Sequence, residues 1–160
     1  MSFSTFSGPL RAGTVREGAG RNTGLTVLSQ SYDTGDLTGT TTGNYDVAAM
    51  VLPAGSQIIN IVVDQVVAAT AGTTTVSVGT TSGGAELMAA VATTAGGRFQ
   101  GTATAATQLA WQTSAAADTQ VYIRDVVGTA TLTAGRFIVT VQYVQKGVVN
   151  GVAVANPVSA

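Results

Sequence analysis

The sequence has no histidine and no cysteine among its 160 residues. This excludes catalysis by an imidazole base or a thiol nucleophile, as well as disulfide bonds and the commonest zinc sites. Charged residues make up only 9% of the chain, against about a quarter in an ordinary soluble domain. The groups left for chemistry are eight carboxylates, six arginines and one lysine. We therefore expect no enzymatic activity, no cofactor and no metal site.

The charge balance and the apolar runs also exclude classes of partner. The net charge is −1, so the basic surplus typical of nucleic-acid-binding proteins is missing. The longest apolar run, residues 47–53, is far shorter than the roughly 20 residues that span a bilayer. Residues 1–9 have neither a basic start nor an apolar stretch, so no secretory signal is predicted. We expect a soluble chain made in the cytoplasm, with neither nucleic acid nor membrane as a partner.

Small residues dominate what is present, with 26 Thr, 25 Ala and 20 Gly. At 15.9 kDa the chain is long enough for one domain. From residue 25 onward, short apolar runs alternate with Gly, Thr, Asn and Asp at the spacing typical of an all-β domain. The sequence predicts a jelly-roll-like antiparallel β-sandwich over residues 25–146. An extended N-terminal arm (1–24) precedes it, and a C-terminal tail or additional strand (147–160) follows.

Several strands can be placed individually. A strand over residues 46–52 is expected to end at Pro53-Ala54-Gly55, with Pro53 second in the turn and Gly55 where positive φ is tolerated. Residues 57–67 are apolar on both faces, which predicts a strand covered on both sides. Residues 86–92 contain Ala, Leu and Met, which favour a helix, but seven residues between two Gly pairs are short for one, so a strand is predicted. Residues 93–108 are weakly patterned. Residues 109–112 are predicted as a short strand.

The two C-terminal strands alternate most clearly, and period two places alternate residues on one face. Residues 119–127 place Val121, Ile123 and Asp125 on one face and Tyr122 and Arg124 on the other. Residues 136–146 form the clearest strand, and their inward face is predicted to hold Phe137, Val139, Val141 and Tyr143. The tripeptide Gly-Arg-Phe occurs at both 97–99 and 135–137, which predicts repeated hairpin chemistry.

Two polar constellations admit both a chemical and a structural interpretation. Asp33-Thr34-Gly35 has the sequence of the aspartic-protease triplet, whose chemistry needs two carboxylates that share a proton. Here the triplet follows a polar stretch and opens a Gly/Thr loop, so turn formation is favoured. The oxygens of Asp33, Asp36, Asn44 and Asp46 could gather around Ca²⁺, but their spacing matches no EF-hand. Asx-turns and hairpin loops are the favoured interpretation here too.

Two sets of residues are candidates for contacts. The arm has three arginines five residues apart together with apolar side chains, and it is either a floppy terminus or a segment that docks on a partner. The docking candidates are Phe3, Phe6, Leu10, Arg11, Arg16 and Arg21. The candidates for the core or a subunit interface are Trp111, Tyr122, Phe137 and Tyr143. A sandwich core is the default position of the last three, and Trp111 fits either role.

Motifs along the chain resemble those of one group of viral proteins. Residues 6–14 (FSGPLRAGT) together with Asn22-Thr23-Gly24 look like the opening of small structural proteins of tailed bacteriophages. Residues 52–56 (LPAGS), leading into 59–64 (INIVVD), are similar to a strand-turn-strand of the same group. Val78-Gly79-Thr80, Val121-Tyr122 and Tyr143-Val144 follow in the expected order.

The family that these motifs resemble is the capsid decoration (cement) proteins of tailed phages. The resemblance implies a homotrimer that binds the major capsid protein on the outer surface of the phage head and stabilises the virion. It carries over no catalytic residue. The alternative is a receptor- or carbohydrate-binding β-module of a head or tail fibre, although neither a repeat-bearing stalk nor an aromatic platform is visible in the sequence.

Overall fold

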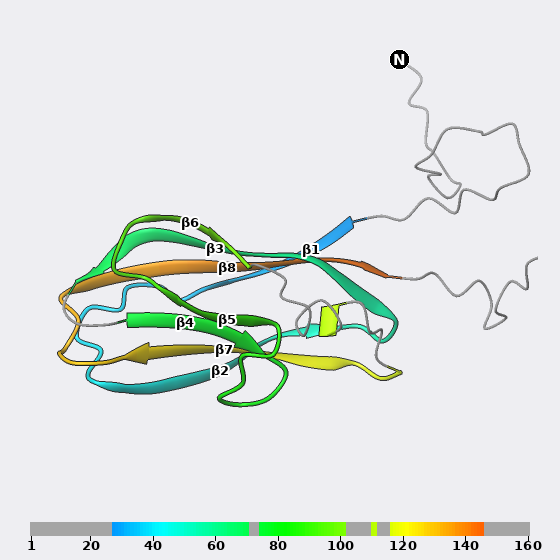
Figure 1. Ribbon diagram of the computed structural model, residues 1–160, viewed down its shortest axis with the longest axis horizontal. Coiled ribbons are helices and arrows are strands. Elements are labelled where there is room, and N and C mark those ends of the chain that lie inside the picture. Colours follow the sequence, from blue (N-terminus) through cyan, green and yellow to red (C-terminus); the bar gives the residue numbers. More distant parts are fainter. Residues whose placement is uncertain (1–26, 71–73, 102–109, 112–115, 146–160) are drawn as a thin grey trace, which may run out of the picture.

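A computed structural model describes residues 27–70, 74–101, 110–111 and 116–145. Within these residues, eight strands form two four-stranded antiparallel sheets that pack face to face (Figure 1). The first sheet has the order β1-β8-β3-β6 and the second the order β2-β7-β4-β5. The strands are β1 (Val27–Asp33), β2 (Gly43–Leu52), β3 (Ser56–Thr70), β4 (Thr74–Gly79), β5 (Met88–Ala92), β6 (Gly97–Gln100), β7 (Thr119–Val127) and β8 (Ala134–Gln145).

The strand order is that of a long hairpin wrapped around itself. β1 pairs with β8, β2 with β7, β3 with β6 and β4 with β5, so the pairs are nested around the β4–β5 connection. Successive strands alternate between the sheets from β1 to β4, because each connection crosses from one sheet to the other. Nested pairing over eight strands in two sheets is the arrangement of a jelly roll. The predicted fold class, a jelly-roll-like β-sandwich, is confirmed.

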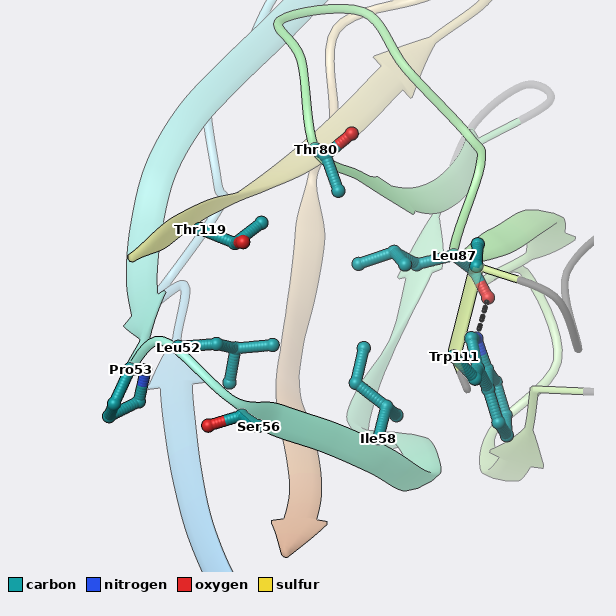
Figure 2. Close-up of a pocket in the computed structure, with 9 residues that line it drawn as sticks. Leu52, Pro53, Ser56, Ile58, Thr80, Leu87, Trp111 and Thr119 are labelled. Atoms are coloured by element: carbon teal, nitrogen blue, oxygen red, sulfur yellow. Dashed lines mark hydrogen bonds between the residues drawn. The ribbon is translucent and has the colours of Figure 1, made fainter. Parts of the chain in front are cut away.

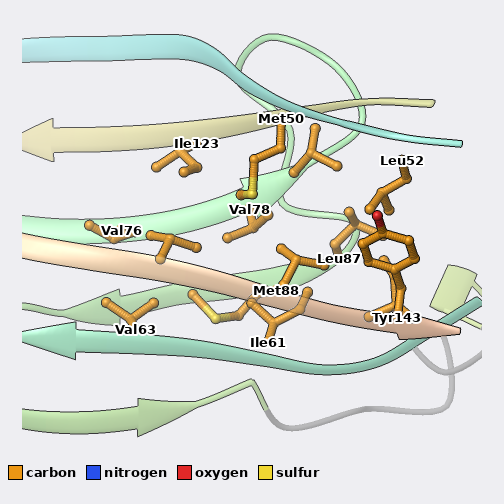
Figure 3. Close-up of a cluster of buried hydrophobic side chains, with 14 of the residues drawn as sticks. Met50, Leu52, Ile61, Val63, Val76, Val78, Leu87, Met88, Ile123 and Tyr143 are labelled. Carbon is orange, nitrogen blue, oxygen red and sulfur yellow. The ribbon is translucent and has the colours of Figure 1, made fainter. Parts of the chain in front are cut away.

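The core lies between the sheets and is built from alternate residues of the strands (Figure 3). β7 and β8 have the alternation predicted from the sequence: Val121, Ile123 and Asp125 face inward on β7. On β8 the inward residues are Phe137, Val139, Val141 and Tyr143, as predicted. Burying each large aliphatic or aromatic side chain contributes about 1.5–3 kcal/mol. The period-two pattern therefore determines which face of each sheet becomes core.

β3 differs from its prediction. Only one of its faces is buried, and Ile59 and Val66 are 45% and 50% exposed. The pairing of β3 with β8 shifts register at both places, between Ile58 and Asn60 and between Gln65 and Val67. Each shift accommodates one extra residue in a β-bulge, which breaks the alternation and turns an apolar side chain outward. The apolar run therefore reflects bulges, and the expected cover on both faces is wrong for the described residues.

Three further predictions are corrected or refined. β6 lies within the stretch that the sequence leaves unpatterned, and it pairs with β3 at Val62–Gln65. Trp111 lies in a helical turn with Ala110, not in a strand. Gly55 has φ of +79° as expected, but the turn is closed by the Ser56 N–H donating to the Pro53 carbonyl, so the proline is first in the turn. Nowhere in the described ranges does a helix reach the length and hydrophobicity of a membrane span.

Candidate interaction surfaces

The structure separates the predicted contact residues into three groups. All six arm candidates, Phe3, Phe6, Leu10, Arg11, Arg16 and Arg21, lie outside the described residues. Trp111, Phe137 and Tyr143 are buried in the core between the sheets. Tyr122 is half-buried on the outer face of the second sheet, where it pairs with Ala48 and Gly79 on the neighbouring strands. Its default placement in the core is therefore wrong, and it remains an interface candidate.

Trp111 seals one end of the sandwich. Its side chain is 8% exposed, and its Nε1–H donates a hydrogen bond of 2.7 Å to the carbonyl of Leu87 (Figure 2). Leu52, Ile58 and Leu87 line a cavity of about 40 Å³ beside it. A space of that size holds no more than a few water molecules, so it is not a ligand site. Trp111 belongs to the core rather than to an exposed interface.

The Asp33-Thr34-Gly35 triplet forms a turn. The Asp33 carboxylate accepts the Gly35 N–H at 2.9 Å and pairs with the Arg136 guanidinium on β8, with Nε to Oδ1 at 3.1 Å. The Thr34 Oγ1 accepts the Phe137 N–H at 3.1 Å, which ties the turn to β8. The hydrogen bond from Arg136, followed by that from Gly35, lowers the pKa of Asp33 to about 2. The carboxylate is engaged in structure, as the favoured interpretation predicted.

The four oxygen-bearing residues proposed as a Ca²⁺ alternative do not converge. Asp33 lies on the outer face of the first sheet, whereas Asp46 lies on the outer face of the second. Asp36 accepts the backbone N–H of Thr38 at 2.9 Å in an Asx-turn, as favoured from the sequence. These hydrogen bonds, with the Thr38 hydroxyl first, lower the pKa of Asp36. In the described part of the chain, no three acidic side chains cluster closely enough to hold a metal ion.

The outer face of the first sheet is polar but electrically balanced. Side-chain amides form a ladder across three strands: Gln100 donates to Asn60, and Asn60 donates to Gln142, both at 3.3 Å. Each Arg of the repeated Gly-Arg-Phe binds an Asp on a neighbouring strand, Arg98 to Asp64 and Arg136 to Asp33. The exposed aliphatic side chains on or beside this face are Val27, Ile59, Val66 and Val67. This face can offer a partner hydrogen bonds and apolar contact without net charge.

The outer face of the second sheet is partly covered by the β4–β5 loop, residues 80–87. Arg124 of β7 donates from Nη1 to the Gly83 carbonyl at 3.0 Å, and Ser82 donates to Asp46 at 3.1 Å. Within the loop, Glu86 accepts the Thr80 N–H at 3.1 Å, and hydrogen bonds to the Glu86 carboxylate, from its own backbone first, lower its pKa. Because the loop lies on β4, residues on both faces of that strand are buried. The sequence placed Arg124 on the face opposite Val121 and Ile123, but it did not indicate that the β4–β5 loop covers this face.

An open edge between the two sheets holds a second cavity. β1 and β2 are neighbouring edge strands, joined by a hydrogen bond of 2.7 Å from the Gln30 side chain to the Val51 carbonyl. Beside this bridge lies a cavity of about 160 Å³, here called the edge cavity. It is lined by Tyr32, Thr34, Leu37, Thr40, Tyr45, Val47, Ile123, Asp125 and Phe137. The lining is mostly apolar and aromatic, so the single carboxyl group stands out chemically.

Asp125 is the chemically unusual residue of the edge cavity. It is 6% exposed, and its Oδ1 has no hydrogen-bond partner. Burial raises the pKa of this carboxyl to about 6, against a smaller opposing effect of the Val126 backbone N–H. The alternation of β7 predicted that Asp125 shares a face with Val121 and Ile123, and the structure shows that this face points inward. It did not indicate that the carboxyl would face a cavity without a basic partner.

Comparison with known proteins relates the fold to viral shells. No protein-family model matches the sequence, and no curated protein matches it. A chain in the capsid of Ralstonia phage GP4 is similar at 25% identity and a TM-score of 0.61, over 77% of this chain and 86% of that one.

Two further capsids contain chains of the same fold. One is the cyanophage Pam1 capsid asymmetric unit (18% identity, TM-score 0.61, 88% of this chain and 99% of that one). The other is the acid-stable capsid of Helicobacter pylori bacteriophage KHP30 (16% identity, TM-score 0.51, 78% and 97%). The chain is thus related in structure to protein chains of bacteriophage capsids.

Proposed function

We propose that the protein is a structural virion protein that binds the outside of a bacteriophage head as a homotrimer and stabilises the capsid. The observation that carries this proposal is the similarity to capsid chains over nearly their whole lengths, 86% to 99%. This chain therefore matches those capsid chains over most of their lengths. A small domain of this kind, repeated in a capsid, fits a decoration protein with the major capsid protein as its partner.

The described surfaces support an added role on a shell built by another protein. The sandwich closes its own core, so it can fold before it meets the shell. Its first sheet offers a balanced polar face with exposed aliphatic side chains, which can be buried without leaving an unpaired charge. Burial of apolar surface against the shell contributes about 25 cal/mol per Å² to the free energy of binding, before the costs of association are subtracted. Many copies bridging adjacent capsid subunits would multiply this effect.

The N-terminal arm supplies the proposed specific contacts. Phe3, Phe6, Leu10 and the three arginines, Arg11, Arg16 and Arg21, are proposed to meet the capsid, the arginines on acidic surface. Ordering a Gly-rich segment costs conformational entropy, and contacts with the partner must offset that cost. The role proposed here is structural, with no catalysis. The pairing of Asp33 with Arg136 supports this because it removes the one triplet that resembles a catalytic motif.

The test compares phage particles made with and without this protein. Particles that lack it should assemble and package DNA, but release the DNA at lower temperature or after milder osmotic shock. Adding the purified protein back should restore resistance, because a ligand that binds only the intact shell shifts the equilibrium towards it. Equal resistance with and without the protein would refute the decoration role. Binding of the protein to host cells or glycans instead would favour the fibre-module alternative.

A further inference from the structure

The edge cavity has the chemistry of a site for an organic cation. Its walls carry the rings of Tyr32, Tyr45 and Phe137, and Asp125 contributes the carboxyl group. Aromatic ring faces attract cations, and a carboxylate with a free lone pair can accept a charged donor. The other titratable groups lining the cavity are the two phenols, and none of its lining residues is basic. A cation that enters would therefore meet no like charge from the lining.

Asp125 differs from the other acids that the structure describes, because its buried Oδ1 has no hydrogen-bond partner. Asp33, Asp46 and Asp64 are each paired with an arginine. The remaining three, Asp36, Glu86 and Asp118, accept backbone N–H groups at 2.9, 3.1 and 2.9 Å. All three described arginines are taken up by these pairs. A partner for the buried Oδ1 of Asp125 must therefore come from elsewhere in the chain or from another molecule.

The chain itself carries a suitable group close in sequence to the cavity. Residues 1–26 contain three of its seven basic residues, and this segment leads directly into β1, the strand that contributes Tyr32 to the lining. From Val27 to Tyr32, β1 extends about 17 Å. Arg21 lies six residues before Val27, a length that extended chain can span with about 20 Å. This length exceeds the roughly 17 Å between Val27 and Tyr32, so the pairing proposed below requires the chain to reverse direction immediately before Val27.

We propose that the guanidinium of Arg21 occupies the edge cavity of its own chain, where it binds Asp125 and stacks on the aromatic lining. A guanidinium suits the cavity better than an ammonium, because it is planar, more weakly hydrated and able to donate two parallel hydrogen bonds to one carboxylate. The pairing fastens the base of the arm to the edge of the sandwich. It removes Arg21 from the set of proposed capsid contacts and leaves the residues from Phe3 to Arg16 to reach the shell.

The test is the titration of Asp125, followed by carboxyl-carbon NMR in the full-length protein. With Arg21 in place, Asp125 should titrate at or below its ordinary value of about 4. In Arg21→Gln its pKa should rise to about 6, because burial then raises it against only the smaller effect of the Val126 backbone N–H. Arg16→Gln, which removes the same charge five residues away, is the matched control and should titrate like the wild type.

Three results would overturn the proposal. Asp125 that titrates near pH 6 in the wild type has no cation beside it, and the cavity then holds at most water. A low pKa that persists in Arg21→Gln requires another donor to Asp125. A rise in pKa in Arg16→Gln, without one in Arg21→Gln, would show that Arg16 is the partner of Asp125. As a second readout, the Arg21 Nε–H signal should be protected from solvent exchange in the wild type and unprotected in Asp125→Asn. Neither measurement involves the capsid, so the outcome is independent of the proposed decoration role.

Discussion

Gly79→Ala tests whether the β4–β5 loop is tightly packed on the second sheet. Gly79 is the last residue of β4, and its φ is not positive, so alanine can adopt its backbone conformation. A Cβ added there would lie 2.5 Å from the carbonyl carbon of Gly84 and 2.7 Å from its oxygen. Carbon atoms in favourable contact are about 3.5–4.0 Å apart, so the loop must move by roughly 1 Å. The Cβ would also clash with the Glu86 carboxylate, but the two Gly84 atoms belong to the backbone and cannot rotate away.

The expected cost follows from two opposing effects. Alanine in place of glycine stabilises a compatible backbone by about 0.4–1 kcal/mol, because it restricts the unfolded chain. Overpacking of this kind costs about 1–3 kcal/mol. Moving the loop also weakens the 3.0 Å hydrogen bond from Arg124 to Gly83 and that from the Leu87 N–H to the Val78 carbonyl. We expect a net loss of about 1–2 kcal/mol, or a fall in Tm of about 2–8 °C for a chain of this length.

Urea denaturation followed by the fluorescence of Trp111, the single tryptophan, measures this loss. Gly96→Ala is the matched control, because a Cβ at Gly96 meets no atom within 4 Å and the φ there is not positive. That variant should be as stable as the wild type or slightly more stable. Hydrogen exchange at the Leu87 amide should accelerate in Gly79→Ala alone. If Gly79→Ala were as stable as Gly96→Ala, the packing argument for the loop would be refuted.

Four other outcomes follow from the same structure. Because the pKa of Asp33 is lowered to about 2, its pairing with Arg136 stabilises the fold above about pH 4 and is lost as the pH falls towards 2. Asp33→Asn should flatten that part of the Tm-against-pH curve, and an unchanged curve would contradict the pairing. Trp111→Phe should lower the free energy of unfolding by about 1–3 kcal/mol, since the buried Leu87 carbonyl loses its donor; a loss below about 0.5 kcal/mol would mean that water replaces the indole. Size-exclusion chromatography with light scattering should give three times 15.9 kDa, and a monomer would contradict the proposed trimer. Deleting residues 2–21 should leave a folded trimer that binds capsid shells more weakly, whereas unchanged binding would move the contact to the sandwich.

The sequence determined those features that depend on neighbouring residues. The alternation in β7 and β8 defined which residues share a face, including Asp125 with Val121 and Ile123, because period two is a local property of extended chain. Turn chemistry was equally local: Gly55 has the positive φ that its place after Pro53-Ala54 favours, and Asp33 caps its own turn. Alternating strands separated by turn residues, in a chain with few charges, were enough to predict a β-sandwich.

Features that depend on residues distant in sequence were decided by the tertiary structure. β6 is four residues long and carries no clear alternation, and it is a strand because β3 offers it a free edge. The bulges that turn Ile59 and Val66 outward exist only in the register with β8. Tyr122 was expected in the core but lies on the outer face of the second sheet. The strand pattern shows which residues share a face, but not which of the two faces packs against the other sheet. The same reason applies to Asp125. The face that it shares with Val121 and Ile123 is a local property, but the cavity beside it is formed by β1, β2 and the loop between them, which meet β7 only in the folded chain.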